Sequence, residues 1–89
     1  MSFYLYIIQN IDGAFYKGVS QHPKLRLLQH NNNEVRSTAQ KGTWRFIAVF
    51  AFDSKTQALI RERKIKKYSR SKILELIEQS DNIVPFFNT

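Results

Sequence analysis

The stretch FYLYIIQNIDGAFYKGVS, residues 3–20, decides the fold. Residues 3–9 are rich in aromatic and β-branched side chains, which favours a strand. Asp12-Gly13 follows, and an Asp-Gly pair between two apolar runs is a strong hairpin signal. Residues 14–19 then return as a second strand. The sequence therefore predicts an antiparallel hairpin near the start of the chain.

A helix and a third strand are expected next. Pro23 suits the first turn of a helix, which should run to about Asn31 with Leu25, Leu28 and also Leu27 as its apolar stripe. Residues 32–43 form a polar loop. Residues 44–52 are apolar except for one arginine and do not alternate, which predicts a strand buried on both faces and hence central in the sheet.

Two more helices complete the pattern. Ser54 to Gln57 form a plausible capping box for a helix reaching about residue 67 or 68. Ser69 or Ser71 could cap a last helix to about residue 79, with Ile73, Leu74 and Ile77 facing inward. The order β-β-α-β-α-α predicts an α+β fold, a three-stranded, mainly antiparallel sheet flanked by helices. Residues 1–80 should form a single domain, and residues 81–89 a C-terminal tail holding Pro85-Phe86-Phe87.

Length and composition narrow the class of protein. The chain has 89 residues, enough for one compact domain, and 43% of them are hydrophobic. It has no cysteine, so disulfides and thiolate metal sites are excluded and a reducing compartment is expected. The first apolar run has no basic leader and is too short to span a membrane. A cytoplasmic protein without a membrane partner is the expectation.

The net charge of +7 is concentrated in one segment. Residues 54–72 carry eight basic side chains and a single acid, Glu62, whereas the rest of the chain is neutral overall. A localised basic patch suits a polyanion such as nucleic acid. The alternative is a solvated helix face that is basic only for solubility.

Glu62 is the first candidate for chemistry. On a helix its neighbours three and four positions away are Ala58, Leu59, Ile65 and Lys66, so three of the four are apolar. A carboxylate beside a core needs a cationic partner, and a hard oxygen ligand suits Mg²⁺ or Mn²⁺. The alternative is an ordinary ion pair between Glu62 and Lys66 at i,i+4.

Two further groups of polar side chains are candidates. Arg26 and His30 are spaced i,i+4 and share a helix face, where an arginine can grip a phosphate and a histidine can move protons. Tyr4 and Tyr6 share a sheet face that Tyr16 could reach from across the hairpin, and phenols near positive charge can activate water. The alternatives are an exposed polar pair on the outer helix face and tyrosines that are simply packed.

In this order and at these spacings, the candidates follow a known pattern. Tyr4-Leu5-Tyr6 and Tyr16-Lys17-Gly18 stand as two tyrosine triplets about ten residues apart, and residues 26–31 read RLLQHN. The second half continues the match with the following residues: Arg36-Ser37-Thr38, Gly42, Trp44, Ala58, Arg61-Glu62, Ile65-Lys66 and Ser69-Arg70. Over residues 3–78 the chain resembles the GIY-YIG nuclease family. It is most similar to small stand-alone members related to the N-terminal nuclease domain of the repair excinuclease subunit UvrC.

The resemblance implies a phosphodiester hydrolase with one divalent cation, Mg²⁺ or Mn²⁺, held by Glu62. Arg26 would hold the scissile phosphate, Tyr6 and Tyr16 would lie by the attacking water, and His30 would support catalysis or contact phosphate. Flanking phosphates would be bound by a set of cations that we infer from charge: Lys17, Arg61, Arg63, Lys66, Lys67 and Arg70.

The chain departs from the family pattern at three places. Tyr4 replaces the glycine of the first triplet, and Lys17 replaces the aliphatic residue of the second. Lys17 would bind phosphate or alter proton chemistry if it faces the site, and would be neutral to function if it faces away. The asparagine that the family often supplies after the glutamate helix has two candidates here, Asn82 and Asn88.

The expected function is a metal-dependent endonuclease acting on DNA, selective for structure rather than sequence, with repair or recombination as its expected setting. The competing expectation is a binding module of the same fold that clamps nucleic acid without cutting it, or docks on a larger repair complex. A third reading, a structural protein that uses Phe86-Phe87 as an interaction tag, rests on the tail alone.

Overall fold

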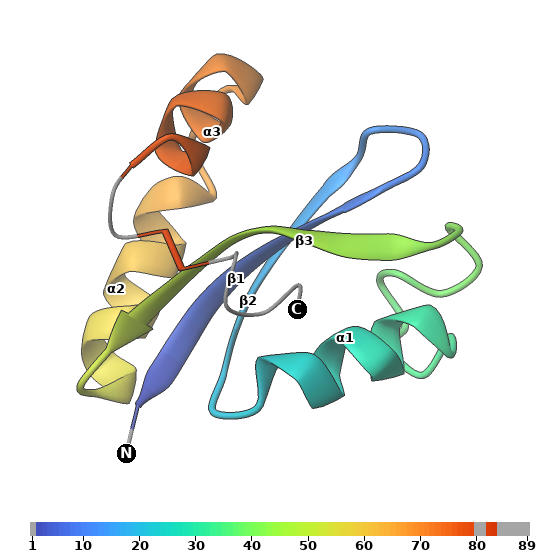
Figure 1. Ribbon diagram of the computed structural model, residues 1–89, viewed down its shortest axis with the longest axis horizontal. Helices are drawn as coiled ribbons and strands as arrows, with labels where there is room; N and C mark the ends of the chain where they lie inside the picture. Colours follow the sequence, from blue (N-terminus) through green and yellow to red (C-terminus); the bar gives the residue numbers. More distant parts are fainter. Residues whose placement is uncertain (1, 80–81, 84–89) are drawn as a thin grey trace.

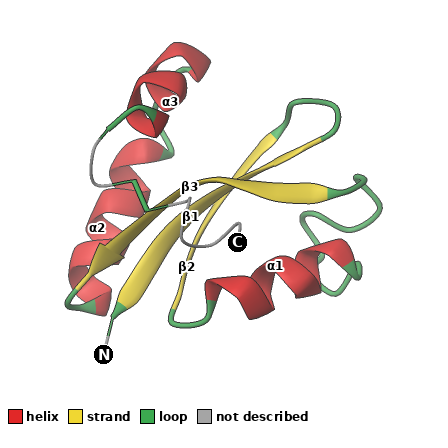
Figure 2. Ribbon diagram, in the orientation of Figure 1, coloured by secondary structure: helices red, strands yellow, loops and turns green. Residues whose placement is uncertain are grey.

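The computed structural model describes residues 2–79 and 82–83, and its order of elements is β-β-α-β-α-α. Figures 1 and 2 show a sheet with α1 on one side and α2 and α3 on the other. The elements are β1 (Phe3–Asn10), β2 (Phe15–Ser20), α1 (Pro23–Asn31), β3 (Trp44–Phe52), α2 (Lys55–Ile65) and α3 (Arg70–Ile77). The predicted fold class and order are confirmed, with strand and helix ends within a few residues of those expected.

The β1–β2 hairpin closes at Asp12-Gly13, as predicted. Gly13 has φ +87°, a left-handed conformation that favours glycine. Asn10 organises the turn, because its side-chain oxygen accepts from the Ala14 N–H at 2.8 Å and its amide donates to the Lys41 carbonyl at 2.8 Å. The second bond also ties the hairpin to the loop that precedes β3.

The strand order is β2-β1-β3, so the expected central position of residues 44–52 is wrong: β1 is central and β3 is an edge strand. The lack of alternation has another cause. The β1–β3 register shifts between Ile7, which pairs with Ala48, and Ile8, which pairs with Phe46. Ile47 is left over as a bulge, and beyond it the side chains change faces.

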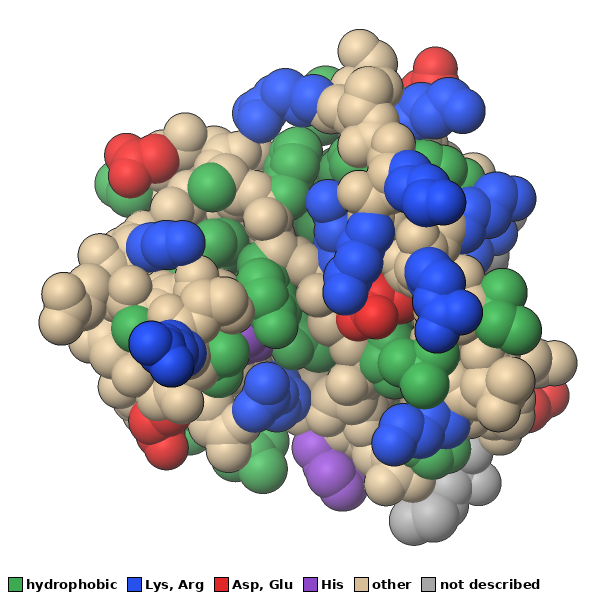
Figure 3. All heavy atoms as spheres, turned by 180° about the vertical axis from the view of Figure 1, so that it is seen from behind, with side chains coloured by type: hydrophobic (Ala, Val, Ile, Leu, Met, Phe, Trp, Pro, Cys, Tyr) green, Lys and Arg blue, Asp and Glu red, His purple; other side chains and the backbone are tan. Residues whose placement is uncertain are grey.

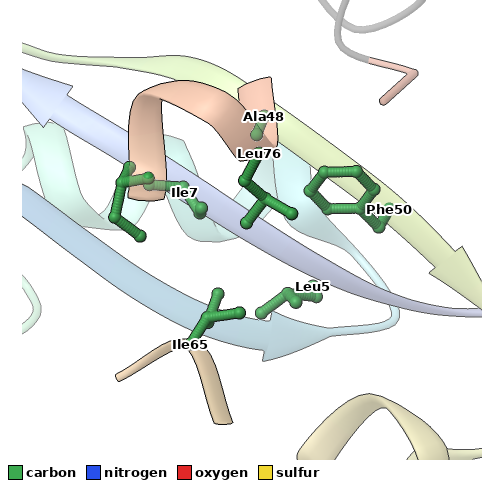
Figure 4. Close-up of a cluster of buried hydrophobic side chains, with 7 residues drawn as sticks. Leu5, Ile7, Ala48, Phe50, Ile65 and Leu76 are labelled. Atoms are coloured by element: carbon green, nitrogen blue, oxygen red, sulfur yellow. The ribbon is translucent and has the colours of Figure 1, made fainter. Parts of the chain in front are cut away.

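The bulge lets β3 contribute to a separate core on each side of the sheet. One core is wholly apolar and is closed by α2 and α3 (Figure 4). Its buried members are Leu5, Ile7, Ala48, Phe50, Ile65, Ile73 and Leu76. We call this side the apolar face. Helices cover both sides of β3, which is why an edge strand reads as apolar throughout.

The opposite side, which we call the site face, is closed by α1. Its buried cluster is Tyr6, Ile8, Trp44, Phe46 and Val49, with Leu27 of α1 packed against it. The predicted stripe of α1 is largely wrong: Leu25 and Leu28 are 53% and 55% exposed, and of the three leucines Leu27 packs inward. Pro23 and His30 are the buried residues of this helix, so α1 turns its polar residues towards the sheet.

The last two helices begin as expected. The side chain of Ser54 accepts from the Gln57 N–H, and that of Ser69 accepts from the Lys72 N–H. In α3, Ile73 is buried as predicted, whereas Leu74 is 49% exposed and Leu76 takes the inward place. No helix among the described residues is long and apolar enough to cross a membrane.

The outer edge of β3 is covered by Asn82 and Ile83. The Asn82 side chain accepts from the Val49 N–H at 2.9 Å and donates to the carbonyls of Ile47 and Ile77 at 3.3 and 2.9 Å. The Ile83 N–H donates to the Val49 carbonyl at 2.8 Å. These bonds satisfy the backbone beside the bulge. The Pro85-Phe86-Phe87 segment and Asn88 lie outside the described residues.

Candidate active site

The two tyrosines meet because the hairpin register places them on one face. Tyr6 pairs with Gly18 and Tyr16 with Ile8, so both phenols join the site-face cluster. The Tyr6 ring lies directly over Gly18: a Cβ added at Gly18 would stand 2.6 Å from Tyr6 Cζ and closer still to its hydroxyl. Glycine is therefore required at this position to leave room for the ring.

α1 brings its two polar candidates to the same place. His30 is fully buried, its Nε2 lies 3.0 Å from the Tyr6 hydroxyl and its Nδ1 lies 2.7 Å from Thr38 Oγ1. Its ring centroid is 4.8 Å from that of Tyr16. Arg26 lies near this group as well, because it lowers the pKa of Tyr6, and its guanidinium donates to Gln29 Oε1 at 2.8 Å. The alternative of an exposed Arg26–His30 pair does not describe the structure.

The surroundings hold both Tyr6 and His30 neutral near pH 7. Burial raises the pKa of Tyr6, Arg26 lowers it in part, and electrostatic interactions with Tyr16 and Glu62 raise it further. Burial lowers the pKa of His30 to about 4, with the positive charge of Arg26 adding to the effect. The Tyr6–His30 contact is thus a hydrogen bond between neutral groups.

Glu62 lies on α2, and its negative charge contributes to raising the pKa of Tyr6. Its side chain is 16% exposed, which agrees with the expected place beside the core. Its carboxylate lies 3.6 Å from Lys66 Nζ, the i,i+4 ion pair that the spacing also allowed. Lys66 is 59% exposed, so solvent screens the Lys66 side of this contact.

A cation site here would rest on one carboxylate. Within residues 2–79 and 82–83, no three His, Asp or Glu side chains gather as a metal site. This donor set does not suit zinc, which takes three or four protein ligands. It does suit Mg²⁺ or Mn²⁺, because such cations keep several waters and are bound by one or two carboxylates together with substrate phosphate. Glu62 fits that requirement.

The cations expected to contact nucleic acid do not form one surface. Lys17 pairs with Ile7 across the hairpin and therefore points to the apolar face, away from Tyr6 and Tyr16. Arg63 and Lys67 line an open groove of about 320 Å³ on the outward side of α2, together with Ile60 and Lys64. Figure 3 shows Lys and Arg gathered over the α2 and α3 half of one face.

Arg70 has structural partners of its own. Its guanidinium donates to the Gly13 carbonyl at 2.9 Å and lies over the Phe15 ring, 4.8 Å from its centroid. It therefore fastens the hairpin turn to α3. Of the six candidate cations, Arg61, Arg63, Lys66 and Lys67 belong to α2 or the turn that follows it.

Sequence reasoning missed the roles of Thr38 and Asn31. Thr38 is 1% exposed and contacts His30, although it comes from a loop expected to be polar. The Asn31 side chain accepts from the Trp44 N–H at 2.7 Å and donates to the Trp44 carbonyl at 3.1 Å, which joins the end of α1 to the start of β3. A signal existed, since both residues were among those matching the family pattern.

Residues 2–74 match the family described as the GIY-YIG catalytic domain. The chain belongs to the GIY-YIG family. The match spans every element of the site, from the first tyrosine triplet to Glu62, and it confirms the resemblance inferred from the motifs.

Its relatives are small proteins of similar length. UPF0213 protein SSP2268 of Staphylococcus saprophyticus is 35% identical over 77 residues, 85% of this chain and 94% of the relative. UPF0213 protein HQ_3675A of Haloquadratum walsbyi is 31% identical and covers 90% of this chain and 91% of its own. The solution NMR structure of UPF0213 protein BH0048 from Bacillus halodurans superposes with TM-score 0.59 at 30% identity, covering 91% of this chain and 87% of that one.

The family defines the general activity. A GIY-YIG domain implies nuclease-type activity, and GIY-YIG nucleases act on nucleic acid. The relatives are UPF0213 proteins, small stand-alone members of this family.

Proposed function

We propose that this protein is an endonuclease that hydrolyses phosphodiester bonds in DNA with one divalent cation, selecting its substrate by structure rather than sequence. The observation that carries the proposal is the convergence of Tyr6, Tyr16, Arg26 and His30 on one face of the sheet, with Glu62 of α2 contributing to the raised pKa of Tyr6. A role in repair or recombination in the cytoplasm, in the manner of UvrC, is part of the same proposal.

Arg26 and Glu62 carry the charges of the proposed reaction. The Arg26 guanidinium would bind the scissile phosphate and stabilise the negative charge that develops as the bond breaks. Glu62 would hold Mg²⁺ or Mn²⁺, and the bound cation would supply positive charge to the phosphate and lower the pKa of water. Lys66 would be displaced from Glu62 when the site is loaded, which the 3.6 Å contact with the exposed Lys66 side chain permits.

The two phenols have different parts in this proposal. Tyr6 is fully buried, with a raised pKa and its hydroxyl against His30, so it is suited to orienting its neighbours while remaining protonated. Tyr16 is half-buried at the edge strand β2, where water can reach it. We therefore assign the position beside the attacking water to Tyr16 and expect Tyr16→Phe to reduce turnover more than Tyr6→Phe.

The substrate preference is argued from charge. Contacts from Arg61, Arg63 and Lys67 would neutralise phosphates and would carry no base readout, so affinity should fall steeply with salt. The described residues hold no further element to read a sequence. DNA with flaps, nicks or branches is the proposed substrate class, and docking on a larger repair complex would direct the protein to it.

Cleavage assays with matched carboxylate variants test the proposal. Wild type should cut branched or single-stranded DNA with Mg²⁺ or Mn²⁺ and stop cutting with chelator. Glu62→Ala should lower the rate at least about 100-fold, whereas Glu75→Ala, which removes an exposed carboxylate from α3, should leave it unchanged. Equal rates for wild type and Glu62→Ala would sink the assignment.

The Glu62–Lys66 ion pair favours a second candidate, a nucleic-acid clamp of the same fold that does not cut. In that case Lys66→Glu with Lys67→Glu should abolish DNA binding, and Mn²⁺ should change neither binding nor stability. A rise in unfolding temperature with Mn²⁺ that disappears in Glu62→Ala would count against the clamp and for the nuclease.

A further inference from the structure

Thr38 is a buried polar residue in the loop between α1 and β3, and it connects that loop to the site. Its hydroxyl lies 2.7 Å from His30 Nδ1 and donates to the Val35 carbonyl at 3.3 Å. Its own carbonyl accepts from the Trp44 indole N–H at 3.3 Å. The side chain is 1% exposed, so water does not compete for these bonds.

These contacts favour one direction for the hydrogen bonds. A threonine hydroxyl has one hydrogen, and because Thr38 gives it to the Val35 carbonyl, its oxygen accepts from His30. A neutral imidazole carries one N–H, which must then be at Nδ1. Nε2 is left with a lone pair, and it accepts the Tyr6 O–H at 3.0 Å.

Arg26 supports the same assignment from the other end. Arg26 has only donors and its positive charge lowers the pKa of Tyr6, which favours an arrangement with the Tyr6 oxygen facing Arg26 and its hydrogen pointing to His30. In the opposite tautomer, His30 Nε2–H would donate to the Tyr6 oxygen, and the Tyr6 hydrogen would have to leave the buried chain of bonds.

We infer that Thr38 is a positioning residue that holds His30 in the Nδ1–H tautomer and thereby directs the Tyr6 O–H into the interior, away from the phosphate. The inference deepens the proposed nuclease function and rests on it for its catalytic consequence. With the Tyr6 hydroxyl held by His30, Tyr16 is the phenol whose proton can enter the reaction. Tyr6 then has a structural part in the site.

Nitrogen-15 NMR of histidine side chains tests the tautomer without any activity. In wild type at neutral pH, His30 should show a pyrrole-type Nδ1 and a pyridine-type Nε2, while the exposed His22 serves as an internal reference. Thr38→Ser, which keeps the hydroxyl, should preserve this pattern. Thr38→Val should shift both His30 nitrogens towards the Nε2–H form. A wild-type spectrum with Nε2–H overturns the inference, whether or not Thr38→Val folds.

Cleavage rates then test the catalytic consequence of the Thr38 contact. Thr38→Val should lower the rate by about 10- to 100-fold, in the range found when groups that orient site histidines are removed, and Thr38→Ser should restore most of it. Ser37→Ala, at the exposed neighbouring position, is the matched control. Loss of activity in Thr38→Val with an unchanged tautomer, or no rescue by serine, also overturns the inference. If wild type has the expected tautomer but never cuts DNA, the nuclease proposal fails and the positioning role stands.

Discussion

Strand β1 presents Leu5 and Ile7 to the apolar face and Tyr6 and Ile8 to the site face, and all four side chains are at most 1% exposed. On the apolar face the neighbours are aliphatic and aromatic residues of α2, α3 and β3. On the site face the Tyr6 hydroxyl meets a buried histidine, which in turn meets a buried threonine. Alternate residues of one strand therefore serve two kinds of core.

The difference lies in what each face demands of its neighbours. Apolar burial is non-directional and tolerates exchange of one hydrophobic residue for another of similar volume. A buried hydrogen-bonded chain is directional, and removing one member leaves its partner unsatisfied. The described part of the chain meets that demand, since none of its buried side-chain polar atoms lacks a partner. We expect substitutions on the apolar face to change stability, and those on the site face to change chemistry as well.

The largest expected effect is on the apolar face. Leu5→Ala removes a fully buried side chain between β3 and α2 and should lower the free energy of unfolding by about 2–5 kcal/mol. Urea denaturation measures this loss, and Leu59→Ala, at a more exposed position on α2, should change it far less. The folded fraction of Leu5→Ala should keep its cleavage rate. A lower cleavage rate in folded Leu5→Ala would show that substitutions on the apolar face also change the chemistry.

Lowering the pH should reduce the stability of the fold through His30 on the site face. The pKa of His30 is lowered to about 4 from 6.5, so between these values the unfolded chain binds a proton that the folded chain refuses. Stability from this group is fully present above pH 6.5 and is lost as the pH falls towards 4. The total is about 3 kcal/mol, at 1.36 kcal/mol for each pKa unit. Thermal unfolding from pH 7 to pH 4 measures it.

The two histidines provide the control for that experiment. His22→Ala should retain the acid slope, because His22 is exposed before α1. His30→Gln has no imidazole to protonate and should show a shallower slope between pH 6.5 and 4, whatever its starting stability. Equal slopes for wild type and His30→Gln would mean that acid acts elsewhere.

The sequence predicted the elements and the family well, because those depend on local signals. The Asp12-Gly13 turn, each serine cap and each tyrosine triplet are signals made by residues within a few positions of one another along the chain. The spacing of Arg26 and His30 correctly placed them on one helix face. Whether that face points to the sheet or to solvent depends on how α1 packs on the sheet. The leucine pattern predicted that Leu25 and Leu28 face inward, whereas both are exposed.

The remaining errors come from tertiary contacts. The change of faces at Ile47 cannot be distinguished from a central strand by apolar content alone. The face of the sheet on which Lys17 lies could be assigned only from the hairpin register. That register pairs Lys17 with Ile7, so its side chain points to the opposite face from that of Tyr16. The role of Thr38 depends on a loop whose path the sequence does not predict. The family pattern includes Thr38, but its contact with His30 is seen only when the three-dimensional neighbours are known.

Asn82 offers an intermediate effect, because it stabilises the bulge through which β3 reaches both faces. Asn82→Ala removes one accepted and two donated hydrogen bonds next to Ile47 and Val49. We expect a loss of about 1–3 kcal/mol in unfolding free energy. Hydrogen exchange should locate the loss, with faster exchange of the Val49 amide than of amides at the β1–β2 pairing. Unchanged protection at Val49 would show that the side chain does not hold this edge.

The smallest effect tests which side of α1 belongs to the site face. Leu27 packs on the cluster containing Tyr6, while its neighbour Leu28 is 55% exposed, so the two form a matched pair on one helix. Leu28→Ala should change the free energy of unfolding by no more than about 0.5 kcal/mol, as is usual for surface positions. Leu27→Ala should cost about 1–2 kcal/mol from lost apolar burial. Because Leu27 follows Arg26 directly, its truncation should also loosen the arginine and raise the KM for DNA. A reversed order of the two variants in urea denaturation would mean that α1 is rotated and that Arg26 and His30 do not face Tyr6.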